Sequence, residues 1–226
     1  MSLISTFRTL FEVNPWKTIY FNLHYFPMKT AIRMPFFIYW RSELYKLKGK
    51  IVIDAPIRTG MIKFGAHGLG TQDLFYSRTM IQLYGTVVVK GKACIGRGSK
   101  ISVGREARLT FGENFMITGD SQIICHKEIT FGNDCLLSWD ILMMDTDFHH
   151  VLDTNGNKTN MPRPISIGNH VWIGCKTVIL KGVSLADDTI VSANSTITRS
   201  FGEPNCIIGG HAQTAEVLRH SVCWEK

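Results

Sequence analysis

The sequence has no pair of cysteines spaced as CxxC, no dense run of basic residues and no apolar run long enough to cross a bilayer. Its six cysteines are scattered, which favours reduced thiols over a disulfide framework or a zinc site. The chain begins without the basic start and sustained Leu/Ala run of a secretory signal. We therefore expect a cytoplasmic protein that binds no metal.

Charge is also scarce, at 19% of the residues, whereas hydrophobic residues make up 45%, a balance that excludes a disordered chain. Basic residues outnumber acidic ones: the sequence has 25 Lys and Arg and 18 Asp and Glu, which gives a net charge of +7. This excess favours an anionic ligand, an anionic glycan or a membrane surface as partner. We expect no nucleic-acid partner, because no recognition-helix pattern or basic-aromatic array accompanies the charge.

What the sequence does contain is a six-residue repeat. From residue 167 every sixth position is aliphatic, and the residues are Ile167, Ile173, Ile179, Leu185, Val191 and Ile197. The position two residues earlier, from Ile165 to Ser195, is β-branched or small in every repeat. The same spacing occurs earlier, at Phe111, Ile117, Ile123, Ile129, Cys135 and Ile141, and in a second register at Val89, Ile95 and Ile101.

An α-helix of period 3.6 cannot keep every sixth residue on one face, but a coil with short straight sides can. Each hexad is then one short strand and a corner, and three hexads close one turn of a parallel β-helix. We expect an all-β solenoid over residues 51–209, with an inserted loop at 145–163, where the repeat fails, and a C-terminal segment at 210–226.

Residues 1–50 do not repeat; they are rich in aromatic side chains and are divided by Pro15, Pro27 and Pro35, which predicts short helices. Two interpretations of this appendage remain open. It can cap the open first coil, which we favour because the end of a solenoid must be covered. It can also contact a membrane peripherally, at the inner face, because lysines and arginines alternate with its aromatic residues.

The segment from Pro164 to Gly174, with the hexads that follow through Ser195, resembles the hexapeptide-repeat acyltransferase superfamily. The resemblance covers about residues 85–219 and is strongest to the O-acetyltransferases of sugars and polysaccharides. It implies a left-handed β-helix, a homotrimer, acetyl-CoA as donor and a carbohydrate or glycan precursor as acceptor. The alternatives are an amino-sugar or other small acceptor, such as serine or an antibiotic, and a non-catalytic trimeric scaffold.

The inserted loop begins Asp-Thr-Asp-Phe-His, a form common in the polysaccharide-modifying branch, and this match implies that His149 is the general base. A sugar hydroxyl is barely ionised at neutral pH, so its attack on a thioester needs a group such as imidazole to take the proton. Asp145 or Asp147 can fix the tautomer of His149, hold the acceptor or cap the turn, and the sequence does not choose among these roles. His150 competes for the role of base, but it stands where relatives often have proline.

The resemblance also implies donor and acceptor contacts. The donor residues are Trp172 beside the acyl-CoA groove, Gly174, Cys175 and Ala193 along the pantetheine arm, and Arg199 and Arg219 near the phosphates. The acceptor residues are Ser138, Trp139 and Asp140. A role in packing remains open as the alternative for both tryptophans. For both arginines the alternative is a solvated surface charge that binds no ligand. The terminal Gly-x-Pro-Ala-Lys element of the family is altered at 210–219, where Glu216 replaces a basic residue, so the path of this segment is open.

Overall fold

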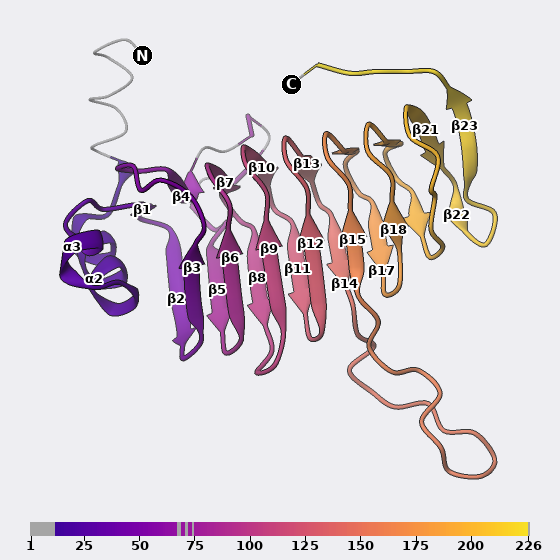
Figure 1. Cartoon of the computed structure of the whole chain (residues 1–226), viewed down its shortest axis with the longest axis horizontal. Coiled ribbons are helices and arrows are strands. Elements are labelled where there is room, and N and C mark those ends of the chain that lie inside the picture. Colours follow the sequence, from indigo (N-terminus) through magenta and orange to yellow (C-terminus); the bar gives the residue numbers. More distant parts are fainter. Residues whose placement is uncertain (1–11, 67–68, 71, 74, 226) are drawn as a thin grey trace.

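The computed structural model describes residues 12–66, 69–70, 72–73 and 75–225. Within this part of the chain, short strands stack into an elongated three-sided prism with two helices at its N-terminal end (Figure 1). A long loop leaves the prism between β14 and β15, and the chain folds back on itself after β22 (Figure 1).

The described strands form three sheets, one for each side of the prism. The first sheet contains, in spatial order, β1 (Phe36–Ile38), β4 (Ile62–Ala66), β7 (Ala93–Gly96), β10 (Phe115–Gly119), β13 (Leu136–Trp139), β16 (Trp172–Ile173), β19 (Ile190–Val191), β21 (Cys206–Gly209) and β23 (Glu216–His220). The second contains β2 (Ser42–Leu47), β5 (Thr79–Leu83), β8 (Lys100–Val103), β11 (Gln122–Cys125), β14 (Leu142–Met144), β17 (Val178–Leu180), β20 (Thr196–Ile197) and β22 (His211–Ala212). The third contains β3 (Lys50–Ile53), β6 (Thr86–Val89), β9 (Arg108–Phe111), β12 (Glu128–Phe131), β15 (Ile165–Ile167) and β18 (Ser184–Leu185).

Three corners join these sheets and recur in each coil. We call the turn from the first sheet to the second the first corner, the turn from the second to the third the second corner, and the turn from the third back to the first the third corner. All strand pairs are parallel except β21 with β23. Corresponding corners therefore stack in columns along the prism.

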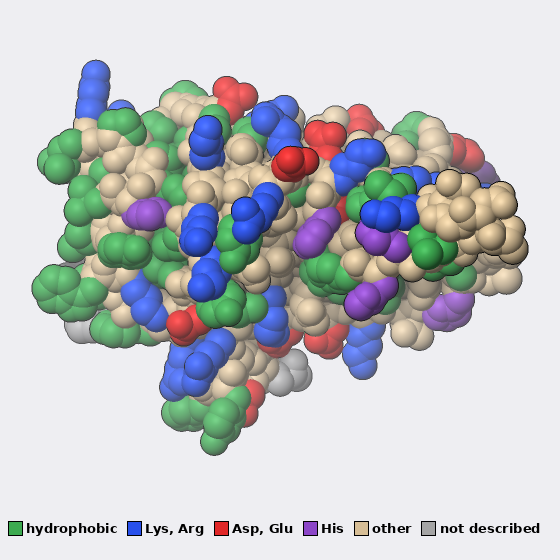
Figure 2. Space-filling view, turned by 90° about the horizontal axis from the view of Figure 1, so that it is seen from below, with side chains coloured by type: hydrophobic (Ala, Val, Ile, Leu, Met, Phe, Trp, Pro, Cys, Tyr) green, Lys and Arg blue, Asp and Glu red, His purple; other side chains and the backbone are tan. Residues whose placement is uncertain are grey.

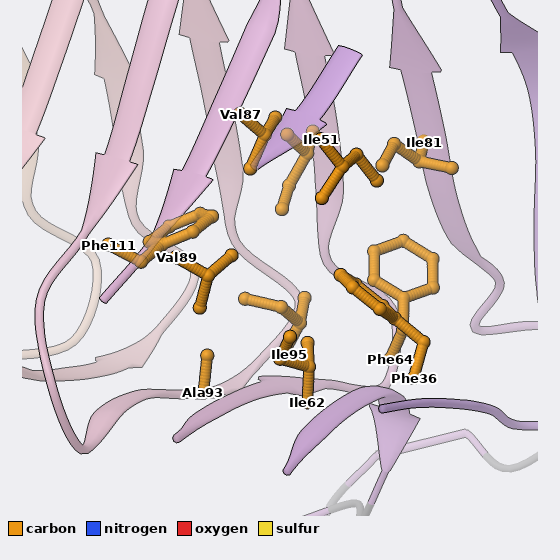
Figure 3. Close-up of a pocket in the computed structure, with 11 residues that line it drawn as sticks. Phe36, Ile51, Ile62, Phe64, Ile81, Val87, Val89, Ala93, Ile95 and Phe111 are labelled. Atoms are coloured by element: carbon orange, nitrogen blue, oxygen red, sulfur yellow. The ribbon is translucent and has the colours of Figure 1, made fainter. Parts of the chain in front are cut away.

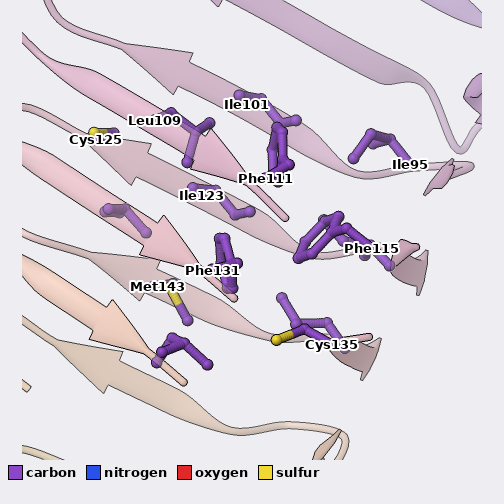
Figure 4. Close-up of a cluster of buried hydrophobic side chains, with 14 of the residues drawn as sticks. Ile95, Ile101, Leu109, Phe111, Phe115, Ile123, Cys125, Phe131, Cys135 and Met143 are labelled. Carbon is purple, nitrogen blue, oxygen red and sulfur yellow. The ribbon is translucent and has the colours of Figure 1, made fainter. Parts of the chain in front are cut away.

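The six-residue repeat fills the interior of the prism, as predicted. None of the six aliphatic residues from Ile167 to Ile197 is more than 3% exposed. The small position two residues earlier also points inward, and its hydroxyls bond to the backbone: Thr189 Oγ1 donates to the Ala186 carbonyl at 2.9 Å. Figure 4 shows the aromatic part of this core, where the rings of Phe111 and Phe115 lie 4.5 Å apart.

The cavity that the described residues enclose has no room for a substrate. A cavity of about 20 Å³ lies between the first coils, lined only by apolar side chains such as Phe36, Phe64 and Ile95 (Figure 3). This volume matches a single water-sized sphere, far below the several hundred Å³ of a ligand pocket. A binding site must therefore use the outer faces, the corners or the inserted loop.

The number of residues in one complete coil differs along the prism. Near the C-terminus Ile173 pairs with Val191, so three hexads close one turn there, as predicted. Earlier turns are longer, because Ile101 pairs with Ile123. The extra residues lie at corners, where Asn114 adopts the left-handed conformation with φ +56°. Asparagine and aspartate tolerate this region better than other non-glycine residues, which lets the corner widen without strain.

The helices α2 (Pro15–Tyr25) and α3 (Met28–Ala31) lie at the N-terminal end of the prism (Figure 1). The buried amide of Asn22 donates to the Phe36 carbonyl at 2.9 Å and accepts from the Phe36 N–H at 3.1 Å. Thr18 Oγ1 accepts from the Ile38 N–H at 3.0 Å, and Phe21 packs on Phe36. These contacts satisfy the open edge of β1, which is what a cap must do.

The parallel strands begin at Phe36, inside the segment 1–50 that the sequence assigns to the cap. Residues 1–11 of that segment lie outside the described residues. At the other end, β22 continues the second sheet, and β23 then runs antiparallel along β21, covering the last edge of the first sheet. Neither helix in the described part of the chain has the length and apolar character that crossing a membrane requires.

Candidate active site

The inserted loop leaves the second corner of its coil, and its base is closed by a hydrogen bond from the Arg163 N–H to the Asp145 carbonyl at 3.1 Å. The loop projects well beyond the prism (Figure 1). Its tip is a turn in which Asp153 Oδ1 accepts from the backbone N–H groups of Asn155 and Asn157, both at 2.8 Å. The loop therefore has an anchored base and an internally bonded tip.

The carboxylate of Asp145 is fully buried. It accepts hydrogen bonds from three consecutive backbone N–H groups of the preceding coil, those of His126 at 2.6 Å, Lys127 at 2.7 Å and Glu128 at 2.8 Å. No hydrogen bond joins it to His149 within the described residues. Of the roles that the sequence left open for Asp145, these contacts support the capping of a turn.

Asp147 is the carboxylate that holds the loop near His149. It forms an ion pair with Lys181 of the next coil, and its Oδ2 also accepts from Asn160 Nδ2 at 2.7 Å. Asn160 Nδ2 donates as well to the His149 carbonyl at 2.8 Å, and the His149 N–H donates to the Asp147 carbonyl at 2.7 Å. Asp147 thus positions the backbone of His149 and makes no contact with its ring that would fix a tautomer.

The ion pair is stable over the physiological pH range. The hydrogen bond from Lys181, followed by that from Asn160, lowers the pKa of the Asp147 carboxyl from its ordinary value of 3.8. A lowered pKa means that the contact is fully present above the ordinary value and is lost only as the pH falls through the lowered one. The loop should therefore stay attached to Lys181 at neutral and mildly acidic pH.

The imidazole of His149 is exposed and makes no hydrogen bond to any residue that the structure describes. The preceding Phe148 has φ +61°. Its ring packs edge-on against the His126 ring, with the two ring centroids 4.8 Å apart. His150, also exposed, follows directly. The arrangement offers an accessible imidazole on an anchored backbone, which suits a general base for a ligand that approaches from outside.

Trp172 lies on the outer face of the first sheet and is 37% exposed. Its Nε1 donates to Ser138 Oγ at 3.1 Å, so a predicted donor residue and a predicted acceptor residue are in contact. Trp224 packs beside it with ring centroids 5.9 Å apart, stacks on His170 at 4.3 Å and donates from Nε1 to the His170 carbonyl at 2.8 Å. The altered C-terminal segment therefore returns to Trp172, which no pattern in the sequence indicated.

The predicted donor residues Gly174, Cys175 and Ala193 stand at the first corner of successive coils, next to Trp139 and Asp140 in the coil before. A Cβ on Gly174 would lie 2.6 Å from the Ala193 nitrogen, so the stacking of coils itself requires glycine there. Cys175 is half-buried and Ala193 is exposed. This corner presents backbone and small side chains that a thin, flexible ligand arm can approach closely.

The two predicted phosphate-binding arginines are not brought together. Arg199 lies at a second corner, where Nε and Nη2 donate to the Ala215 carbonyl at 3.0 and 2.6 Å and the guanidinium lies over the Phe201 ring. Arg219 is exposed on β23 of the first sheet. Arg199 thus has a structural role at the C-terminal turn, which sequence reasoning did not identify. Among the described residues, no three His, Cys, Asp or Glu side chains are grouped so as to hold a metal ion.

One chain does not assemble the complete predicted site. His149 belongs to a loop on the second corner, whereas Trp172 and Ser138 lie on the first sheet, the side of the prism opposite that corner. The residues that sequence reasoning missed, Asn160 and Lys181, lie with His149. Lys181 is distant from Asp147 in sequence and reaches it only because the next coil stacks beside the loop.

Comparison with known proteins agrees with these observations. A family model described as bacterial transferase hexapeptide (six repeats) matches residues 164–199. The galactoside O-acetyltransferase of Escherichia coli K12 is 34% identical over 115 residues, which cover 50% of this chain and 51% of that protein. The polysialic acid O-acetyltransferase of Escherichia coli O1:K1 is 26% identical over 147 residues, covering 65% of this chain and 45% of that protein. The chain thus matches about half the length of these curated relatives.

The crystal structure of the polySia-specific acetyltransferase NeuO superposes with a TM-score of 0.52 at 20% identity, covering 82% of this chain and 72% of that one. This likeness concerns the fold, which is a left-handed parallel β-helix as the sequence predicted. The chain is thus similar to bacterial transferases with hexapeptide repeats over residues 164–199, and to the two O-acetyltransferases over half to two thirds of its length.

Proposed function

We propose that this protein transfers acetyl from acetyl-CoA to a hydroxyl of a sugar or surface-polysaccharide precursor. The observation that carries the proposal is the exposed imidazole of His149, held on a backbone that Asp147, Asn160 and Lys181 fix. Relatives named as galactoside and polysialic acid O-acetyltransferases support an acceptor hydroxyl on a carbohydrate.

His149 acts as the general base of a direct transfer. The imidazole takes the proton of the acceptor hydroxyl while that oxygen attacks the thioester carbonyl carbon. The new C–O bond forms, the C–S bond breaks, and the proton passes to the departing thiolate. The exposed ring is available to both partners, because Asn160 binds the His149 carbonyl and leaves both ring nitrogens for ligands.

We infer a homotrimer, because in one chain the loop leaves the second corner, whereas the donor residues stand at the first corner, at the other edge of the second sheet. The outer face of the first sheet carries a ladder of mostly apolar side chains in register. Trp172 is exposed, and the half-buried members are Cys94, Met116, Leu136, Ile190 and Ile207. A second copy packed on this face would cover the ladder and bring its loop toward Trp172. His149 of one protomer then serves the donor corner of its neighbour.

The residues of the first corner fit the donor, since Gly174, Cys175 and Ala193 present backbone and small side chains to a passing thioester arm. Acetyl-CoA supplies the acetyl group as a thioester when bound. The described residues hold no group of ligands for a metal ion, and the proposed step uses none.

Acetyl-CoA should therefore protect the thiol of Cys175 from a maleimide. Cys223 is exposed but adjoins Trp224, which packs on Trp172, so a change in its labelling would also report donor binding. The thiols of Cys125 and Cys206 should stay unlabelled in the native protein, because burial raises the pKa of both. Peptide mass spectrometry with and without acetyl-CoA measures all four; equal labelling of Cys175 in both samples would contradict a donor site at this corner.

The decisive experiment is release of free CoA thiol from acetyl-CoA in the presence of glycan precursors. Thiol release should depend on a sugar hydroxyl, and the product should carry an acetyl ester that mild base removes. Transfer only to amino groups, or no acceptor-dependent release across a panel of sugars, amino sugars and serine, would overturn the proposal.

The cap has a second face, and we infer that it contacts an anionic membrane on the cytoplasmic side. Trp16, Ile19, Tyr20 and Leu23 form one stripe along α2 and are 76%, 38%, 55% and 48% exposed. Exposed Lys29 lies in the neighbouring helix α3, and exposed Arg33 follows that helix. An aromatic stripe with adjacent cations is suited to the headgroup region of anionic bilayers.

Vesicles of phosphatidylglycerol and phosphatidylcholine should therefore sediment the protein, and pure phosphatidylcholine vesicles should do so weakly. The double variant Trp16→Ser, Leu23→Ser should lose this binding, whereas Tyr76→Ser, which removes an 84% exposed aromatic residue elsewhere, should keep it. Unchanged sedimentation of the double variant would show that the stripe is not the contact.

A further inference from the structure

We propose that a basic ridge on the second corner, formed by Lys48, Lys50, Arg105, Arg108 and Lys127, binds an extended anionic polysaccharide and leads it to the loop that carries His149. The inference deepens the proposed function, since it assigns a polymeric, negatively charged acceptor to the same site. Nothing in the sequence alone places these five cations together.

The ridge follows from the stacking of coils. Lys48 and Lys50 flank the second corner of the first coil, Arg105 and Arg108 that of the third, and Lys127 that of the fourth. All five side chains are exposed. With about 4.8 Å between neighbouring strands, the row spans roughly 14 Å. Figure 2 looks onto this corner and shows several Lys and Arg side chains on the face between the N-terminal end and the loop.

The ridge carries a net positive charge. Two acidic residues, Glu106 and Glu128, accompany the five cations. The third corner has the opposite character in its C-terminal half, where Glu113, Asp134 and the pair Asp187 and Asp188 stand in three of its coils. A polyanion therefore meets attraction along the ridge and repulsion along part of the third corner.

The ridge joins the candidate active site directly. Lys127 donates its backbone N–H to Asp145, the first residue of the loop, at 2.7 Å. His126, next to Lys127, packs against Phe148, which precedes His149. A chain lying along the ridge is thus led to the base of the loop that presents the imidazole.

The features of the ridge suit a glycan with carboxylate or phosphate groups. The guanidinium of Arg105 lies over the ring of Tyr84, 5.8 Å from its centroid, so the corner also offers an aromatic surface beside a cation. Sugar rings pack on aromatic faces, while guanidinium and ammonium groups pair with anions. A single sugar does not span the row, which favours a polymer. Nucleic acid is disfavoured, because the ridge lacks the regular alternation of aromatic and basic side chains on which successive bases stack.

The test is direct binding of fluorescently labelled polysialic acid to the full chain, measured by polarisation at fixed salt. The triple variant Arg105→Ala, Arg108→Ala, Lys127→Ala should raise the dissociation constant by about tenfold or more. The matched control is Arg58→Ala, Lys90→Ala, Lys92→Ala, which removes three exposed cations from the third corner. It should change binding by no more than about twofold, because screening limits distant charges.

The proposal is overturned if both triple variants weaken binding equally, if neither does, or if unlabelled neutral dextran competes as well as polysialic acid. It is also overturned if a thymidine oligonucleotide of equal charge binds the unsubstituted protein more tightly and loses that binding in the ridge variant. Because the readout needs no catalysis, absence of acetyl transfer would refute the proposed function and leave the ridge to be judged on binding alone.

Discussion

Replacement of His149 by alanine is expected to lower kcat for acetyl transfer by about 10²- to 10⁴-fold, the usual contribution of a general base. The backbone at this position is held by Asn160 and Asp147, and neither contact uses the imidazole. The substitution therefore removes the ring and leaves the anchored loop in place. Initial rates of thiol release at saturating acetyl-CoA and acceptor measure the loss.

The control is the neighbouring His150→Ala, which removes an equally exposed imidazole from the same loop. It should keep activity within a few-fold, and both variants should retain the mass of the unsubstituted assembly in solution. If His149→Ala keeps full activity, or if His150→Ala loses as much, the assignment of the base is wrong. Full activity in both variants would mean that another group is the base, whereas no acetyl transfer by the unsubstituted protein would favour a non-catalytic scaffold.

Replacement of Asp145 by alanine is expected to lower the free energy of unfolding by about 3–5 kcal/mol. The buried carboxylate is the partner of three consecutive N–H groups, and alanine would leave these donors unpaired where β11 turns into β12. Chemical denaturation followed by tryptophan fluorescence measures the change. A loss of this size is large against the marginal stability of a folded domain.

Asp153→Ala is the matched control for this prediction. Asp153 also accepts three hydrogen bonds, two from backbone N–H groups and one from Asn157 Nδ2, but it lies exposed at the loop tip, where water can replace it. The denaturation midpoint should hardly move in this variant. Equal effects of Asp145→Ala and Asp153→Ala would mean that the buried carboxylate has no special part in closing the corner.

Much of the architecture can be predicted from spacing alone. Aliphatic residues at every sixth position are compatible with a three-sided coil and with no helix, and Ile173, Ile179 and Val191 are all fully buried. The break of the repeat after Met144 also marks the inserted loop, because a loop has no strand to keep in register. The extent of the cap was less predictable, since the strands of the first coil, from Phe36 onward, do not show the six-residue pattern.

The roles of the two aspartates show where prediction from sequence ends. Asp145 and Asp147 are two residues apart and chemically identical, so linear order offers no way to separate them. The fold separates them through distant partners: the backbone from His126 to Glu128 surrounds one carboxylate, and Lys181 pairs with the other. The fold also separates the two predicted donor arginines, because Arg199 lies at a second corner and Arg219 on the first sheet.

The order of side chains along the chain was enough to specify the repeating coil, its apolar interior and the loop that carries His149, because each of these depends on residues a few positions apart. The stacking of coils was needed to settle which carboxylate supports the loop, where Trp224 lies, and that five cations form one ridge. Those features depend on residues that become neighbours only when separate turns align, and the pattern within one turn does not specify which corner side chains will meet across turns.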